Sequence, residues 1–332
     1  MCVIKIDDRF KPFSHTFGQR CMIPKSNWGI EAYPREIRFF FEEKSISLEL
    51  DLSAPIKEFT LQLDLEKDVV RVFGRAKEGY FHFEIFHEGK KIVTTLKRGH
   101  SIPYSFAGKK GVLERHQFLE IETERAFEDY QLERLSLGVT KKLDWEMVIR
   151  RGELKEILPI LFFLGQKVDS DLSDSSFSID SIQSFIKAHF DFMLVPKRSV
   201  EKRIGTTEKD LPEHIKFSAI LYKCYEHIRS FFLKEEKGAV FIFPNLPKEF
   251  IYGKLVGLKT SKAIIDIEWT KRRVRKVRVV ATGSGVLEIK WPKDIDSFRL
   301  KNRPHEKGKM VSSSDDIILS PGQIYYLDKF QK

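Results

Sequence analysis

Short runs of alternating apolar and polar residues dominate the first part of the chain. From Phe59 to Leu65 every second position is apolar and the positions between are polar, which is the period-two pattern of a half-buried β-strand. The polar segments 42–44 and 88–90 are typical of turns. Many short strands at close spacing predict an antiparallel β-sandwich over residues 1–143. Its strands are expected at residues 36–41, 45–50, 59–65, 80–86, 92–96 and 118–122.

The apolar period changes to that of an α-helix over residues 144–236. Residues 145–164 and 181–194 carry apolar side chains at helical intervals, and Gly152 and Pro159 are expected to divide or kink the first of these helices. A third helix is predicted over residues 210–232, where a capping-box-like pair precedes the apolar positions. This part of the chain is therefore predicted to form a short helical module.

The remaining residues, 237–332, return to short apolar strands. The predicted fold class is thus mainly β, with two antiparallel β-sandwich-like domains joined by a short α-helical module. The three expected units are residues 1–143, 144–236 and 237–332. Strands of the last unit are expected at residues 239–243, 263–269, 274–280, 286–291, 298–300, 317–319 and 324–327.

The segment that follows the first of these C-terminal strands is the most distinctive motif in the chain. Two prolines confine a turn, two glycines punctuate the next connection, and an alternating strand ends at a tryptophan. This order resembles the junction between the helical barrel and the C-terminal β-domain of family 95 glycoside hydrolases, the α-L-fucosidase group. The resemblance begins at Glu236, implies common ancestry, and includes none of the catalytic residues of that family. The matching residues are Phe243, Pro244, Asn245, Leu246 and Pro247, then Gly253, Gly257, Leu258 and Lys259, and finally Asp266, Ile267, Glu268 and Trp269.

The layout of β-domain, helices and β-domain also resembles family 95 enzymes, but the helical segment is short. An α/α barrel needs about twelve helices, which at ~10–14 residues each plus connections exceeds ~150 residues. Residues 144–236 have room for roughly three to five helices. A complete catalytic barrel does not fit, so the resemblance transfers no catalytic residue. A dimer that builds a site across its interface remains open.

These observations favour a glycoside-hydrolase-related protein that is non-catalytic or degenerate and that binds carbohydrate or acts as a scaffold for a protein partner. One alternative is an active glycosidase that uses an Asp/Glu pair, because glycoside hydrolysis needs two carboxyl groups facing one bond. A second alternative is a basic nucleic-acid-binding module, since the net charge is +10.

The composition indicates the class of protein and its cellular location, but it says little about function. Hydrophobic residues make up 42% and charged residues 32% of the chain, which is typical of a soluble globular protein. The N-terminus lacks the apolar core of a signal peptide, and no apolar run is long enough to cross a membrane. Cys2, Cys21 and Cys224 have no metal-binding spacing. We therefore expect a cytoplasmic protein with no cofactor, no metal and no membrane span.

Seven residues are candidates for ligand binding because they combine aromatic rings with charged neighbours. A tryptophan or tyrosine ring stacks on the apolar face of a sugar, and nearby carboxylates or a charged trio before a strand bind its polar groups. The alternative is that these rings pack in the core and that the charges are solvated at the surface. The candidates are Trp28, Tyr33, Glu36, Arg115, His116, Asp144 and Trp145.

The densest basic run in the chain lies between two predicted C-terminal strands. It is the candidate phosphate-contacting patch of a nucleic-acid-binding module. No aromatic residue alternates with these charges as a base-stacking platform requires, so a solvated hairpin is the simpler interpretation. The residues are Lys271, Arg272, Arg273, Lys276 and Arg278.

Overall fold

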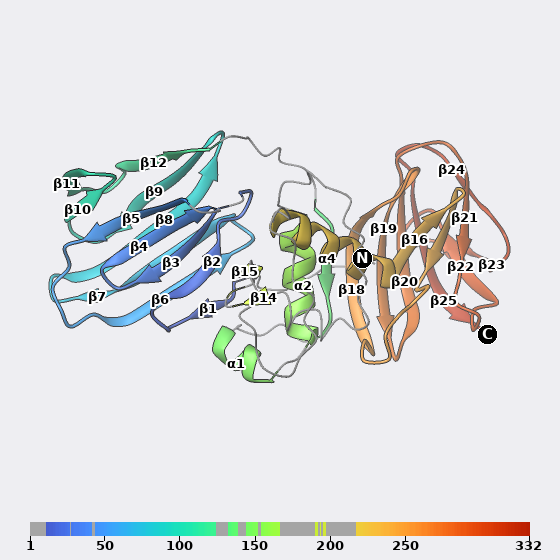
Figure 1. Ribbon diagram of the computed structural model, residues 1–332. Helices are drawn as coiled ribbons and strands as arrows, with labels where there is room; N and C mark the ends of the chain where they lie inside the picture. The colour runs from blue at the N-terminus through green and yellow to red at the C-terminus, as the bar shows by residue number, and fades with distance from the viewer. Residues whose placement is uncertain are drawn as a thin grey trace.

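Two β-sandwiches flank a small group of helices in the computed structural model (Figure 1). The fold class predicted from the sequence is confirmed, because the described residues lie mainly in strands and the sheets are almost entirely antiparallel. The structure describes residues 11–26, 28–41, 44–123, 132–138, 144–151, 154–166, 190–191, 193, 195–196 and 217–332.

Two six-stranded sheets form the N-terminal sandwich. Apolar side chains at every second position, such as Val72 and Phe83 in one sheet and Ile37 and Phe39 in the other, are buried in the core. Sheet A consists, in spatial order, of β1 (Phe13–Ser14), β6 (Lys57–Asp64), β7 (Val69–Ala76), β8 (Gly79–Glu88), β9 (Lys91–Arg98) and β12 (Phe118–Glu122). Sheet B consists of β11 (Lys109–Leu113), β10 (Ile102–Phe106), β5 (Lys44–Leu50), β4 (Glu36–Phe41), β3 (Gly29–Tyr33) and β2 (Gln19–Met22).

Alternation along the central strands of sheet A leaves polar and aromatic side chains on its outer face. Val70 and Val72 of β7 are buried, whereas Arg71 and Phe73, which alternate with them along the strand, are only partly buried. In the same way β8 buries Phe81, Phe83 and Ile85 and leaves Glu84 partly accessible. The outer face of sheet A is therefore the place where this sandwich presents chemically functional groups.

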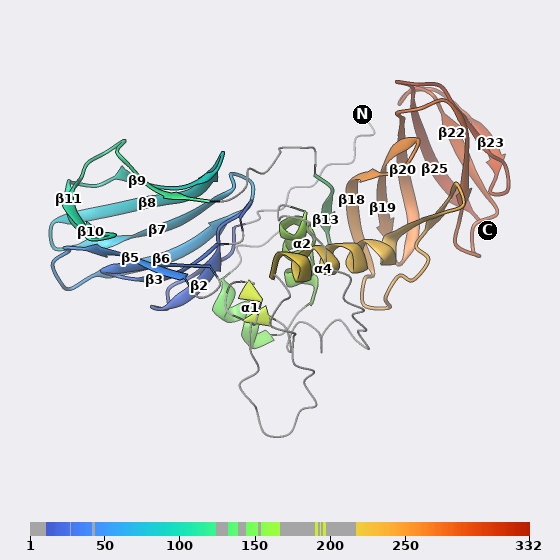
Figure 2. The same ribbon diagram turned by 45° about the horizontal axis from the view of Figure 1, so that its top comes forward.

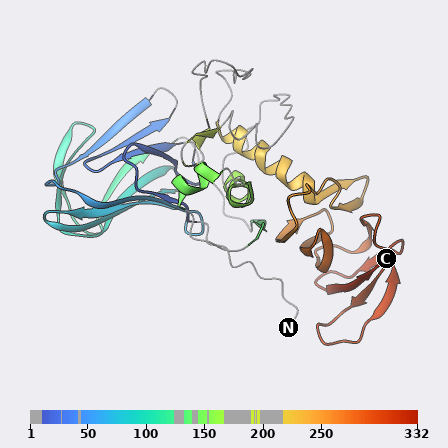
Figure 3. The same ribbon diagram turned by 90° about the horizontal axis from the view of Figure 1, so that it is seen from below.

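Three helices are described between the sandwiches, and Figures 2 and 3 show the last of them running towards the C-terminal sandwich. Pro159 lies inside the second helix, which is continuous from Leu154 to Gly165, so the proline does not divide it. Gly152 lies outside the described residues. The second and third helices pack closely at Gly165, where an added Cβ would lie 2.4 Å from the carbonyl oxygen of Leu221. The helices are α1 (Trp145–Arg151), α2 (Leu154–Gly165) and α4 (Phe217–Phe232).

Strand pairing replaces the end of one predicted helix. A helix was predicted over residues 181–194, but β14 (Phe190–Asp191) pairs with β15 (Val195–Pro196) as sheet D, and Met193 forms a bridge to Cys21 of β2. That part of the prediction is wrong, because backbone pairing overrides the apolar period. Residues 181–189 and the predicted start of the third helix lie outside the described residues.

A seven-stranded and a four-stranded sheet form the C-terminal sandwich. Its seven-stranded sheet begins with a strand from before the helices, since β13 pairs with β18. Sheet C consists, in spatial order, of β13 (Arg134–Ser136), β18 (Tyr252–Lys259), β19 (Ala263–Thr270), β20 (Arg273–Ala281), β25 (Ile324–Gln331), β22 (Ser297–Lys301) and β23 (Lys309–Ser312). Sheet E consists of β16 (Leu233–Glu236), β17 (Ala239–Ile242), β21 (Gly285–Lys290) and β24 (Ile317–Leu319), with β17 and β21 parallel.

Candidate functional site

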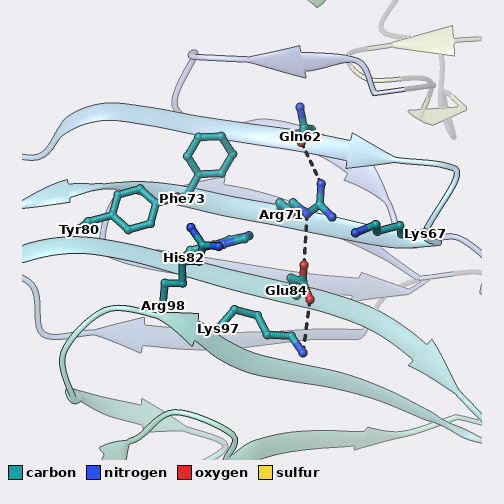
Figure 4. A pocket seen from close by; sticks show the side chains of 9 residues that line it. All are labelled: Gln62, Lys67, Arg71, Phe73, Tyr80, His82, Glu84, Lys97 and Arg98. Carbon is teal, nitrogen blue, oxygen red and sulfur yellow. Dashed lines mark hydrogen bonds and ion pairs between the residues drawn. The ribbon is translucent and has the colours of Figure 1, made fainter. Parts of the chain in front are cut away.

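An open groove of about 550 Å³ crosses β6, β7, β8 and β9 on the outer face of sheet A. Figure 4 shows its polar side chains in a line across the strands, beside a separate group of aromatic rings. The groove is lined by Gln62, Lys67, Arg71, Phe73, Tyr80, His82, Glu84, Lys97 and Arg98.

The polar line follows the strand register. Gln62 lies opposite Arg71, and Arg71 lies opposite Glu84, so that the three side chains point to the same face. The Arg71 guanidinium donates to Gln62 Oε1 at 3.3 Å and to Glu84 Oε1 at 3.2 Å. Lys97 Nζ lies 3.6 Å from the other Glu84 oxygen. Buried Asp64 approaches Arg71 Nη1 at 2.7 Å, so the guanidinium is held from three sides.

The aromatic group occupies the neighbouring positions of β7 and β8. The rings of Phe73 and His82 lie 5.7 Å apart edge to face, and the Tyr80 ring lies 6.4 Å from each of them. Burial lowers the pKa of His82 and raises the pKa of Tyr80. The buried His82 Nε2 has no hydrogen-bond partner among the described residues. These rings form an apolar surface at one end of the groove.

A β-bulge explains why two consecutive cations of β9 line the groove. His82 pairs with Arg98, whereas the next residue, Phe83, pairs with Leu96. Lys97 is therefore the extra residue of the bulge. The extra residue breaks the strict alternation, so both Lys97 and Arg98 reach the outer face.

Positive charge exceeds negative charge among the groove-lining residues. Four cationic side chains, those of Lys67, Arg71, Lys97 and Arg98, stand against the single carboxylate of Glu84. Arg71 and Lys97 are engaged by that carboxylate. Within the described part of the chain, the exposed side chains of Lys67 and Arg98 form no ion pair. The groove therefore has spare positive charge for a ligand.

The line of outward positions continues past the groove to the edge strand β12. Glu84 pairs with Thr95, and Thr95 pairs with Phe118, whose side chain is 57% exposed. An exposed aromatic ring thus lies on the same face of sheet A, two strands away from Glu84.

Both tryptophans predicted to bind ligand are buried. Trp28 is 7% exposed and stacks on Phe41 with the ring centroids 5.5 Å apart. Trp145 is 4% exposed at the start of α1. Neither ring offers a free face for a sugar, because both are packed in the core.

Tyr33 and Glu36 lie together on sheet B, at the turn between β3 and β4. Arg38 donates to both Glu36 oxygens, at 2.7 and 2.8 Å, and its guanidinium lies 5.0 Å from the Tyr33 ring centroid. The hydrogen bonds from Arg38 lower the pKa of Glu36. These groups already satisfy one another.

Arg115 and His116 precede β12 near the end of β9. Arg115 Nε donates to the carbonyl oxygen of Gly99 at 3.0 Å, and His116 has a left-handed backbone with φ of 67°. Both side chains are exposed, and neither lines the groove.

Asp144 precedes α1 and caps it, accepting a hydrogen bond from the backbone nitrogen of Glu146 at 3.1 Å. It also forms a bridge with Phe13 of β1. The seven predicted binding residues therefore do not form one site. They lie in four separate places, which are the pair Tyr33 and Glu36, the pair Arg115 and His116, the pair Asp144 and Trp145, and Trp28 alone.

The predicted basic patch is largely neutralised by neighbouring acids. Arg278 donates to buried Asp266 at 2.6 Å, Lys276 lies 3.6 Å from Glu268, and Arg273 lies 3.7 Å from Asp294. The other two predicted members occupy the turn between β19 and β20, where Arg272 Nη2 donates to the carbonyl oxygen of Leu246 at 3.1 Å and Lys271 has a left-handed backbone.

The groove residues were missed from the sequence, although part of their signal was present. Alternation in the predicted strand at 80–86 places Tyr80, His82 and Glu84 on one face. The strand at Val69–Ala76 was not predicted, so nothing indicated that Arg71 and Phe73 lie beside them. The bulge on β9 has no distinctive sequence pattern.

The chain matches no protein-family model, and no curated protein is significantly similar to it. The described helices include none that is long and apolar enough to cross a membrane. In the described part of the chain, no group of three or more His, Cys, Asp and Glu side chains is arranged to hold a metal ion.

Proposed function

We propose that this protein is a non-catalytic carbohydrate-binding protein and that the groove on sheet A is its sugar site. One observation carries the proposal: a line of hydrogen-bonding side chains lies beside a group of aromatic rings within a single open groove (Figure 4). We further propose that its C-terminal region shares ancestry with family 95 glycoside hydrolases.

The chemistry of the groove matches that of a sugar. A sugar hydroxyl both donates and accepts hydrogen bonds. Gln62 and Glu84 supply acceptor oxygens, and Arg71 and Lys97 supply donors. The rings at the other end suit the C–H face of a pyranose, which is apolar. A ligand that runs along β7 and β8 would contact both.

The polar line is ordered before a ligand arrives. Arg71 is fixed by Gln62, Glu84 and Asp64, and its side chain is 15% exposed. Binding therefore costs little side-chain entropy at this position, and preorganisation of this kind increases affinity.

The position of Glu84 supports a binding rather than a hydrolytic role. Glycoside hydrolysis requires a second carboxyl group on the other side of the scissile bond. Glu84 is the single carboxylate among the described residues that line the groove, and it is paired with Arg71 and Lys97. It is placed to accept hydroxyl hydrogens.

The residues that carry the family resemblance have structural roles, which supports ancestry rather than shared chemistry. Trp269 is 1% exposed, packs against Phe232 and Phe243, and donates from Nε1 to the carbonyl oxygen of Phe250 at 3.0 Å. Asp266 accepts a hydrogen bond from the backbone nitrogen of Gly257 at 2.8 Å. These groups stabilise sheet C.

A glycan array followed by calorimetry tests the proposal. We expect selective binding, and Tyr80→Ala should weaken it about tenfold, which corresponds to ~1.4 kcal/mol. Tyr252→Ala is the matched control, because Tyr252 is similarly exposed but lies on β18, and it should bind as the wild type does. A blank array, or equal loss in both variants, contradicts the proposal. Saturable hydrolysis of a fucoside or another glycoside by the pure protein would overturn its non-catalytic part.

A further inference from the structure

We infer that the groove takes an acidic carbohydrate, a glycan chain bearing carboxylate groups, and that Arg98 binds one of those carboxylates. This inference rests on the proposed sugar site and adds the chemical class of its ligand.

The four cations of the groove fall into two classes. Arg71 and Lys97 each form an ion pair with Glu84, at 3.2 and 3.6 Å, and so belong to the polar line. The side chains of Arg98 and Lys67 are exposed and form no ion pair with any residue that the structure describes. A ligand anion is the partner that these two side chains lack.

Arg98 is positioned to hold a carboxylate beside the aromatic rings. It lies opposite His82 in the register, and the His82 ring lies next to both Phe73 and Tyr80. A guanidinium binds a carboxylate through two parallel N–H donors. A sugar ring that rests on Tyr80 would therefore bring an attached carboxylate within reach of Arg98.

The second unengaged cation lies at the far end of the groove. Figure 4 shows Lys67 and Arg98 on opposite sides of the polar line formed by Gln62, Arg71 and Glu84. An extended chain with repeated acidic residues would meet a cation at each end and hydroxyl-binding groups between them. This arrangement favours an acidic oligosaccharide over a single acidic sugar.

The central carboxylate favours a glycan over a nucleic acid. Glu84 lies between Arg71 and Lys97 in the polar line, where it accepts hydrogen bonds from hydroxyl groups but repels a phosphate backbone. A nucleic-acid backbone has one phosphate per nucleotide and would place negative charge along the whole groove.

The test compares a panel of uronic-acid oligosaccharides with their carboxyl-reduced, neutral counterparts of the same linkage and length. We expect at least one acidic oligosaccharide to bind about tenfold or more tightly than its reduced counterpart, in a manner weakened by salt. Arg98→Gln should remove most of that preference, and Lys67→Gln should remove part of it for the longer oligosaccharides. Arg35→Gln is the control, because it removes one exposed cation from a loop of the same sandwich and should leave the preference unchanged.

The outcomes separate this inference from the proposed function. Equal binding of acidic and reduced oligosaccharides overturns the inference and leaves the sugar site standing. A preference for acid that survives Arg98→Gln overturns the role of Arg98. Binding of single-stranded DNA that Tyr80→Ala abolishes, without binding of any glycan, overturns both. Absence of binding to every acidic and neutral glycan overturns the proposed function and this inference with it.

Discussion

Arg229 of α4 and Glu133, the residue before β13, form a buried ion pair with 3.0 Å between Nε and Oε2. Glu133 is 2% exposed, and its carboxylate also accepts from Tyr225 Oη at 2.9 Å and from the backbone nitrogen of Lys259 at 2.9 Å. One carboxylate thus joins α4 to β18. Gln166 accepts a hydrogen bond from the backbone nitrogen of Glu133 at 2.8 Å and donates one to the Glu133 carbonyl oxygen at 2.9 Å. These bonds attach the end of α2 to the same residue.

Removing the charge of Glu133 should destabilise the protein. Glu133→Gln leaves the Arg229 cation without its counter-ion, and breaking a buried pair of this kind costs about 3 kcal/mol. This value is the low end of the roughly 3–5 kcal/mol that breaking a buried ion pair costs. The low end applies because the Arg229 side chain is 21% exposed. Urea denaturation measures the free energy of unfolding. Glu226→Gln, at an exposed ion pair on the same helix, should change it by less than about 0.5 kcal/mol. Similar values for the two variants would contradict the role of Glu133.

Gly257 is required by the backbone of β18. It has φ of +81° at a bulge, and an added Cβ would lie 3.3 Å from the carbonyl oxygen of Leu132. Gly257→Ala should lower the free energy of unfolding by about 1–2 kcal/mol, because other residues adopt a left-handed backbone at that cost. Gly283→Ala is the control, since its φ lies outside the left-handed region and its Cβ would have space. Unchanged stability of Gly257→Ala would show that the bulge rearranges.

Glu146 of α1 should make stability depend on acidity. Its pKa is lowered by hydrogen bonds from Thr16 Oγ1 and Ser14 Oγ, both at 2.9 Å, and from the backbone of His15. A lowered folded-state pKa stabilises the protein above the ordinary value of 4.5, and this stabilisation is lost as pH falls through the folded-state pKa.

The stability difference between wild type and Glu146→Gln should therefore be largest near neutral pH and shrink below pH 4.5. Denaturation series at several pH values measure it. Thr16→Val should reproduce part of the effect, because it removes one of the hydrogen bonds. Glu249→Gln, at an exposed position, should show no such trend. A difference that grows on acidification would contradict the assignment.

The titration of His82 should report the charge of the ligand. Burial lowers its pKa below 6.5; among its charged neighbours, Glu84 opposes this shift and Arg71, Arg98 and Lys97 reinforce it. A bound carboxylate adds negative charge, so an acidic oligosaccharide should raise the pKa of His82 and bind more tightly as pH falls through the pKa that His82 has in the complex.

Nuclear magnetic resonance titration with and without the oligosaccharide measures this pKa. His227 on α4 is the internal control, because burial also lowers its pKa but it lies outside the groove. A neutral ligand should leave the pKa of His82 unchanged or lower it. The same result with an acidic ligand would contradict the placement of its carboxylate.

Phe118 should matter for long ligands alone. Its exposed ring lies on the outer face of sheet A, beyond the groove. Phe118→Ala should weaken several-fold the binding of oligosaccharides that are long or branched enough to extend across β9 to β12 as well as from Arg98 to Lys67, and it should leave short ones unaffected. Calorimetry across a length series tests this. Val112→Ala, at an exposed apolar position of sheet B, should have no effect at any length.

Several features of the fold follow directly from local sequence. The alternation from Phe59 to Leu65 predicts the strand that becomes β6, and the helical period around Pro159 predicts α2. These predictions succeed because each depends on side chains that are near one another in the chain. Local sequence also contains the outward positions Tyr80, His82 and Glu84, since a strand sends alternate residues to opposite faces.

The sequence by itself therefore determined the fold class, the approximate extent of many strands, and which of their positions are apolar. The tertiary structure decided the rest. Trp28 became a core residue rather than a binding residue, β13 joined sheet C across the helical segment, and the register with its bulge placed Arg98 beside His82. The physical reason is that pairing and burial depend on which distant strands meet, and a local pattern of apolar and polar residues does not encode its partner.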